Sequence, residues 1–165
     1  ILSGLNKMDT DFGILRTDFL DPAQYHMVPL VEDHLIALMC ESHPLASQTQ
    51  INLQALKEEK LVLPTRQSDL YAICENACLA AGFSPKIGYS ISGKPDITID
   101  IVRRGQAICL AMERVMSHYP LDGCRIVQLE QEIRSTTALT WLKSVDLNQA
   151  CRMFKTFMMV RMNTE

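Results

Sequence analysis

Short apolar runs separated by polar and helical stretches recur along most of the chain. Runs of four to eight apolar residues that are too short for surface helices predict buried strands, and regular alternation predicts half-buried ones. The predicted strands are Asp11 to Arg16, His34 to Cys40, Leu61 to Leu63, Pro85 to Ser92, Ala107 to Ala111, Cys124 to Leu129 and Thr136 to Lys143. Between the first two, Asp21-Pro22 and Pro29 predict a loop.

Apolar residues at helical spacing predict helices between these strands. The clearest helix has Asp69 as its N-cap and ends before Gly82, which can adopt the left-handed conformation of a C-cap. The last helix follows the candidate caps Asp146 and Asn148 and is expected to dock on the body of the protein. Its apolar face consists of Leu147, Cys151, Phe154 and Met158.

The segment from Ile97 to Arg104 carries conflicting signals. Its β-branched residues favour a strand, whereas Asp96 as a cap and Gly105 as a stop favour a helix. We interpret it as a helix. A shorter helix is predicted after the N-cap Asn52, and one helical turn from Arg114 to His118.

Repeated strand–helix–strand units predict the α/β class, with parallel strands, right-handed crossovers and helices on both faces. Two long apolar strands, His34 to Cys40 and Thr136 to Lys143, enclose the most regular block of the chain. This arrangement is typical of one lobe inserted into another, with the two strands as a hinge. The predicted first lobe is residues 1–39 and 138–165, and the predicted second lobe is residues 40–137.

Composition narrows the possible functions. A chain of 165 residues with 47% hydrophobic content can bury a core, which excludes disorder. A net charge of -3 and scattered basic residues argue against a nucleic-acid or anionic-membrane surface in this segment. No apolar run approaches the roughly 18 residues of a membrane span, and the start does not resemble a signal peptide. We therefore expect a cytoplasmic protein with no membrane partner.

Six cysteines lie mostly inside apolar runs, without a Cys-x-x-Cys pair or zinc-ligand spacing. They are interpreted as reduced core residues, and neither a metal nor a cofactor is expected. Cys74 and Cys78 are four residues apart in a predicted helix, which leaves a thiol redox sensor open as an alternative.

Several short motifs occur in a fixed order along the chain. The first runs from Met8 to Ile14, the second is the Ser-His-Pro-Leu-Ala turn from Ser42 to Ala46, and the third is Ala80 to Phe83 with Pro85 beyond it. The last runs from Val102 to Leu110. Together they resemble the effector-binding domain of LysR-type transcriptional regulators. The resemblance implies two lobes of periplasmic-binding-protein type joined by two hinge strands, with a small effector held between them.

The chain departs from the family pattern at three points. Gly105-Gln106-Ala107-Ile108 replaces the usual Gly-x-Gly-Ile, and Met112 replaces a proline. The opening strand–helix–strand unit of roughly 30 or more residues is missing, as is the N-terminal helix-turn-helix domain. The first lobe is therefore expected to be incomplete, with an exposed apolar face or a partner chain over it.

Ligands of open parallel sheets bind beyond the carboxyl ends of the strands, near helix N-termini that favour anions. The loops at these ends match, by resemblance, the effector loops of the family; hydroxyl groups would donate to an organic anion and Arg66 would neutralise it. An ordinary polar turn explains residues 65–68 equally well, and Arg16 fits a solvated surface charge better. The predicted effector-binding residues are Thr17, Thr65, Arg66, Gln67, Ser68, Ser92, Gly93 and Met112.

No motif supports catalysis. His43 is better explained as shaping its turn than as a base, and Glu113 as a hydrogen-bond acceptor or helix-start carboxylate. The sequence thus predicts the sensing domain of a transcriptional regulator that is not an enzyme. Its expected partners are a small-molecule effector, further copies in a dimer or tetramer, and DNA only through the missing N-terminal domain. A solute-binding protein or small enzyme on the same fold is the other alternative.

Overall fold

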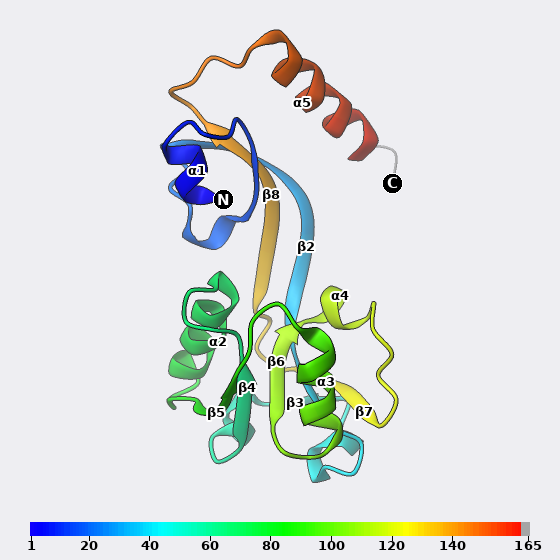
Figure 1. Ribbon diagram of the computed structural model, residues 1–165. Helices are drawn as coiled ribbons and strands as arrows, with labels where there is room; N and C mark the ends of the chain where they lie inside the picture. The colour runs from blue at the N-terminus through cyan, green and yellow to red at the C-terminus, as the bar shows by residue number, and fades with distance from the viewer. Residues whose placement is uncertain (163–165) are drawn as a thin grey trace. The chain divides into compact units, whose positions relative to one another are not determined.

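The computed structural model describes residues 1–162, and the chain divides into two compact units (Figure 1). Unit 1 comprises residues 1–32 together with the chain from residue 135 onward, and unit 2 comprises residues 33–134. Strand β2 (Tyr25–Cys40) crosses the boundary in one direction, and the chain crosses back at the start of β8 (Arg134–Leu142). The predicted α/β class is confirmed.

Unit 2 is built on a mixed sheet whose strands run in the order β2-β6-β4-β5, with β7 and β3 continuing on the far side of β2. The strands β4, β5 and β6 are parallel to one another, whereas β2 is antiparallel to both β6 and β7. Their bounds are β3 Gln50–Ile51, β4 Lys60–Leu63, β5 Lys86–Ser90, β6 Ile108–Met112 and β7 Cys124–Leu129.

Both faces of the central strands β2, β4 and β6 are buried, because their residues alternate between two separate core clusters. Leu35, Ala37 and Met39 of β2 pack in one core cluster together with α2 (Asp69–Ala80). Ile36 and Leu38 pack in a second cluster with α3 (Pro95–Arg103). Figure 1 shows the two helices on opposite sides of the strands. The prediction of helices on both faces is confirmed.

The helix starts in unit 2 differ from the sequence prediction. The N-cap of α2 is Ser68, so Asp69 is the first helical residue and not the cap. The ambiguous segment is helical as predicted, but α3 begins at Pro95 and not after Asp96, because the fixed φ of proline suits the first helical position. Gly82 has the positive φ of 86° expected at a helix end.

Two further short elements agree with the sequence. Asn52 caps a 3-10 turn, Leu53–Leu56, by accepting a hydrogen bond from the N–H of Gln54 at 3.0 Å. The short helix α4 (Glu113–Met116) follows β6 directly.

Unit 1 contains the sheet segment β1-β8-β2, in which β1 (Gly13–Arg16) is antiparallel to β8. The loop predicted around Pro29 is wrong, since Pro29 lies within β2. The ladders of β2 with β6 and β7 begin at Leu35 and Ile36, so Pro29 lies outside both and takes no hydrogen bond from either. The helix α1 (Leu2–Asn6) contributes the buried Leu5.

The last helix, α5 (Gln149–Met162), docks through its first turns. Asn148 caps it by accepting from the N–H of Cys151 at 2.9 Å, and Phe154 contacts the Phe12 ring at 5.4 Å between centroids. Beyond this contact the helix is apolar and exposed, with Phe157 55% and Val160 61% accessible. Apolar side chains on the later turns of α5 are therefore exposed in unit 1. No helix among residues 1–162 has the length and hydropathy to cross a membrane.

The packing of unit 2 predicts that two leucine-to-alanine substitutions will differ strongly in how much they lower the free energy of unfolding. Leu110 in β6 is fully buried, whereas Leu79 on α2 is 53% exposed. Leu110→Ala should lower the free energy of unfolding by about 2–5 kcal/mol through lost burial and a residual cavity. Leu79→Ala should change it by less than about 0.5 kcal/mol. Urea unfolding followed by far-ultraviolet circular dichroism measures both, and equal losses would contradict this account of the core.

Candidate functional site

A cavity of about 210 Å³ lies within unit 2 where β4, β5 and β6 end. The parallel strands bring three loops to the same edge of the sheet, so residues distant in sequence line one space. Strand ends supply an apolar floor that includes Leu63, Ile91 and Ala111. The wall is completed by Val115 and Met116 of α4.

Two helices begin at this cavity. Ser68 and Leu70 line it from the start of α2, and Lys94 and Pro95 line it from the start of α3. In neither helix does the side chain of the N-cap residue, Ser68 or Lys94, hydrogen-bond to an N–H group of the first turn. The first N–H groups of a helix lack acceptors within the helix, and the helix dipole adds partial positive charge there. Two uncapped helix starts therefore face one small space.

The polar side chains of the cavity are few and specific. They are the hydroxyls of Ser68, Ser92 and Thr98 and the ammonium group of Lys94. Thr98 is 8% exposed and its hydroxyl donates to the Lys94 carbonyl at 3.4 Å. Thr98 was not predicted from the sequence, and Lys94, which follows Ser92 and Gly93 at the same strand exit, is not among the predicted contacts. Thr98 lies one helical turn after Lys94, a spacing that could have indicated a shared face.

The predicted residues divide into two groups in this region. Ser68, Ser92 and Gly93 line the cavity. Thr65, Arg66 and Gln67 belong to the same loop but lie outside the cavity lining. The Arg66 guanidinium lies 5.8 Å from the centre of the Tyr71 ring, which gives it a partner other than a ligand.

The remaining two predicted residues have other surroundings. Met112 is fully buried in the core at the end of β6. Thr17 belongs to unit 1, where its hydroxyl donates to the Thr136 carbonyl at 3.3 Å. Beside it, Arg16 donates to the buried Ser135 hydroxyl at 2.8 Å, and that hydroxyl donates to Asp18 at 2.7 Å. Arg16 is thus a structural partner in unit 1.

A polar network at the start of unit 2 was not predicted from the sequence. The His34 ring Nε2 lies 3.0 Å from both the Gln128 amide oxygen and a Glu113 carboxylate oxygen, and Gln128 donates to Glu113 at 2.7 Å. The buried Asp33 accepts from the N–H groups of His34 and Arg114, at 2.8 and 3.1 Å. These contacts join β2, β7 and the first turn of α4, and no local pattern links such distant positions.

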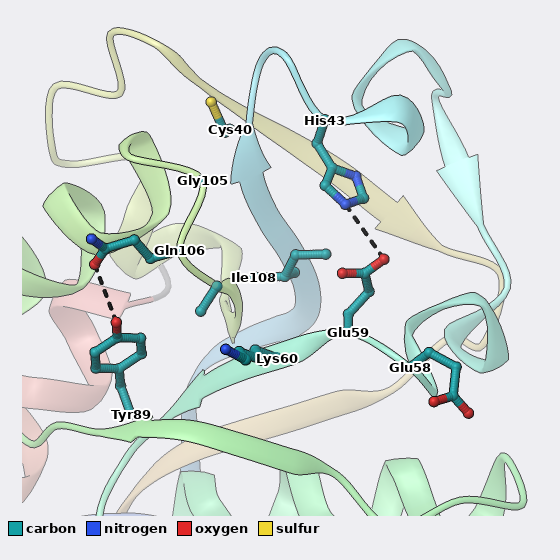
Figure 2. A pocket seen from close by; sticks show the side chains of 10 residues that line it. Cys40, His43, Glu58, Glu59, Lys60, Tyr89, Gly105, Gln106 and Ile108 are labelled. Atoms are coloured by element: carbon teal, nitrogen blue, oxygen red, sulfur yellow. Dashed lines mark hydrogen bonds and ion pairs between the residues drawn. The ribbon is translucent and has the colours of Figure 1, made fainter.

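A second, more open pocket of about 500 Å³ lies at the opposite, amino-terminal ends of β4 and β6 (Figure 2). The His43 Nδ1 accepts from the Leu45 N–H at 3.2 Å, and its Nε2 lies 3.6 Å from Glu59. His43 therefore shapes its turn, as predicted. Lys86 donates to Glu58 at the rim, and this hydrogen bond and charge lower the pKa of the Glu58 carboxyl. Cys40 lines the same pocket.

The two cysteines of the redox alternative are packed in the core of unit 2. Cys74 and Cys78 are both fully buried on the face of α2 that meets the sheet. Burial, together with the nearby Glu75 carboxylate, raises the pKa of the Cys78 thiol to about 11. Since the thiolate is the reactive form, this environment makes Cys78 inert at neutral pH.

The chain belongs to the family of the LysR substrate binding domain, whose sequence profile matches residues 1–162. The resemblance stated from the sequence motifs is therefore confirmed. Over 129 residues the chain is 26% identical to the uncharacterized HTH-type transcriptional regulator YwbI of Bacillus subtilis (strain 168). This alignment covers 78% of the chain and 42% of that protein, so the chain spans less than half of this relative.

Solved structures of regulators share the fold. The effector binding domain of QuiR in complex with shikimate superposes with a TM-score of 0.83 at 19% identity, covering 99% of this chain and 77% of that one. The PA01 LysR family protein of Pseudomonas aeruginosa superposes with a TM-score of 0.76 at 25% identity, covering 98% of this chain and 57% of that one. At 19% identity, the similarity to QuiR shows a shared fold and nothing further.

The loop between β5 and α3 depends on Gly93. Gly93 has a φ of 64°, which an L-residue adopts only with strain, although no atom lies within 4 Å of an added Cβ. Gly93→Ala should therefore lower the free energy of unfolding by about 1 kcal/mol. Gly88→Ala is the matched control, because Gly88 has no positive φ and its added Cβ meets only ordinary contacts. Chemical denaturation compares the two, and an unchanged Gly93→Ala stability would contradict the strained turn.

Proposed function

We propose that this chain is the effector-binding part of a LysR-type transcriptional regulator and that a small organic anion binds in the cavity of unit 2. The observation that carries the proposal is the pair of uncapped helix starts, α2 and α3, at one cavity. At α2 the N–H of Leu70 can donate to a carboxylate or phosphate in the cavity. At α3 the first residue, Pro95, has no N–H, and the helix contributes the positive end of its dipole.

The side chains around the cavity complement this role. Lys94 supplies a full positive charge, and the hydroxyls of Ser68, Ser92 and Thr98 supply directional hydrogen bonds. The carboxylates of Asp69 and Asp96 lie in the first helical turns and oppose an anion, so Lys94 is needed to offset them. The apolar floor favours a ligand with a compact carbon skeleton.

The volume of about 210 Å³ suits a small metabolite better than a drug-sized compound. The QuiR domain is in complex with shikimate, a cyclic carboxylate of this size class, and the CcmR regulatory domain of Synechocystis is in complex with 2-PG. Shikimate is therefore a suitable first probe here. Thr17, Thr65, Arg66, Gln67 and Met112 remain predicted contacts beyond the cavity lining.

In the complete regulator the effector would act on DNA through a helix-turn-helix domain, as the name of the relative YwbI indicates. We propose a cytoplasmic homodimer with no enzymatic activity. In this proposal the two predicted lobes respond to the effector, the first being residues 1–39 with 138–165 and the second residues 40–137. The six free cysteines accord with a reducing compartment. A ligand can shift such an assembly only through different affinities for its two arrangements.

Calorimetric titration tests the cavity. Shikimate, together with a panel of small carboxylates and inorganic phosphate, is first ranked by the thermal shift of the 165-residue chain. For the best binder, Ser68→Ala and Ser92→Ala should each weaken binding about tenfold, the value of one lost hydrogen bond to a charged ligand. Lys94→Ala should weaken it at least as much.

Ser47→Ala is the matched control for this titration. Its hydroxyl donates to the Pro44 carbonyl in the same unit and does not line the cavity, so affinity should be unchanged. Full affinity in both Ser68→Ala and Ser92→Ala would refute the proposed site. Unfolding curves of all variants separate lost binding from lost folding.

A further inference from the structure

Two cysteines lie directly opposite one another on neighbouring strands of unit 2. Cys40, the last residue of β2, is the register partner of Cys124, the first residue of β7. The strands are antiparallel, so the side chains of opposite residues point to the same face of the sheet. The two thiols are therefore neighbours although they are far apart in sequence.

The backbone hydrogen bonds around Cys40 and Cys124 show which of the two kinds of antiparallel residue pair they form. The Glu41 N–H donates to the Gly123 carbonyl at 3.0 Å, whereas the Cys124 N–H donates to the Leu121 carbonyl at 2.8 Å. Backbone bonding thus involves the residues that flank Cys40 and Cys124 and not the pair itself. In such a non-hydrogen-bonded pair the Cα atoms are about 4.5 Å apart, and the side chains approach more closely than in a bonded pair.

The sulfur atoms are held against the same helix. The Cys40 Sγ donates to the Arg103 carbonyl at 3.3 Å, and the Cys124 Sγ donates to the Ile99 carbonyl at 3.9 Å. These carbonyls are four residues apart and lie one above the other on consecutive turns of α3. The helix therefore holds both thiols on one side of the sheet, independently of the strand register.

We propose that Cys40 and Cys124 form a reversible intramolecular disulfide when the protein meets a peroxide. A disulfide requires Cα atoms roughly 4.4–6.8 Å apart, and the spacing of about 4.5 Å typical of a non-hydrogen-bonded pair falls within that range. The proposal concerns a site outside the effector cavity and does not depend on the proposed function.

The reaction balances with one peroxide. The Cys40 thiolate attacks a peroxide oxygen, the O–O bond breaks, and a sulfenic acid forms while the released hydroxide takes up the thiol proton as water. Cys124 then attacks the sulfenic sulfur, the S–S bond forms, and the S–O bond breaks. The leaving hydroxide takes the Cys124 proton as a second water. Two thiols are oxidised and one peroxide is reduced.

The different solvent exposure of the two cysteines determines which of them reacts first with peroxide. Cys40 is half-buried and lines the open pocket at the amino ends of β4 and β6, where Figure 2 shows its sulfur at the pocket margin. A peroxide can reach it there. Cys124 is only 8% exposed, so it is placed to resolve the sulfenic acid and not to react first.

The charges around Cys124 give the second step a pH dependence. Burial, with further contributions from Cys40 and the Glu41 carboxylate, raises the pKa of Cys124 against the opposing charge of Arg103. The thiolate fraction of Cys124 is therefore small at neutral pH and grows as pH rises. Conversion of a preformed Cys40 sulfenic acid to the disulfide should accelerate between pH 7 and pH 9, whereas a pH-independent rate of this step would exclude Cys124 as the attacking thiol.

Mass spectrometry of the folded 165-residue chain tests the disulfide. After treatment with hydrogen peroxide and alkylation of the remaining thiols, two of the six cysteines should be protected. Peptide mapping should recover Cys40 linked to Cys124, and dithiothreitol should restore both thiols. Cys40→Ser and Cys124→Ser should each abolish the product, and Cys124→Ala provides a second variant if serine is not tolerated at this buried site.

Cys74→Ser and Cys78→Ser are the controls, because these buried cysteines should not take part and the linked peptide should persist in both. Three outcomes overturn the proposal while circular dichroism confirms a native fold: no loss of thiols, oxygen addition at Cys40 as the only product, or a disulfide in any other pair.

Discussion

The buried sheet of unit 2 is the constraint on which the other features depend. Its strands β2, β4 and β6 send alternate residues into two separate clusters, so both faces must be covered. The helix α2 covers one face and α3 the other. A sheet that is apolar on both faces has few alternative packings, since a shift of one residue would exchange the two clusters.

This packing also creates the cavity proposed for the effector. Each crossover helix must start near the end of one parallel strand in order to return along the sheet. The starts of α2 and α3 are thereby brought to the ends of β4 and β5, and residues from both starts line a common space. Under the proposed function, the preference for an anion follows from this arrangement, and Ser68, Ser92 and Lys94 add to it.

The antiparallel strand β2 accounts for the second candidate site. Because β2 runs opposite to β6, its carboxyl end lies beside the amino ends of the parallel strands. Cys40 is therefore placed at the open pocket and opposite Cys124, with α3 spanning both ends of the unit. The same helix borders the effector cavity at Pro95 and accepts hydrogen bonds from both thiols near its end.

The sequence alone determined the class and most elements, because strand and helix periodicity, Gly82 and Asn148 are local signals. It also predicted Ser68, Ser92 and Gly93 at strand exits, and these residues do line the cavity. Pro29 was misread because a proline locally predicts a loop, whereas its place in β2, outside the ladders with β6 and β7, is set by the tertiary structure. The His34–Glu113–Gln128 network and the Cys40–Cys124 pair required the tertiary structure, since strand register joins residues that no local pattern relates.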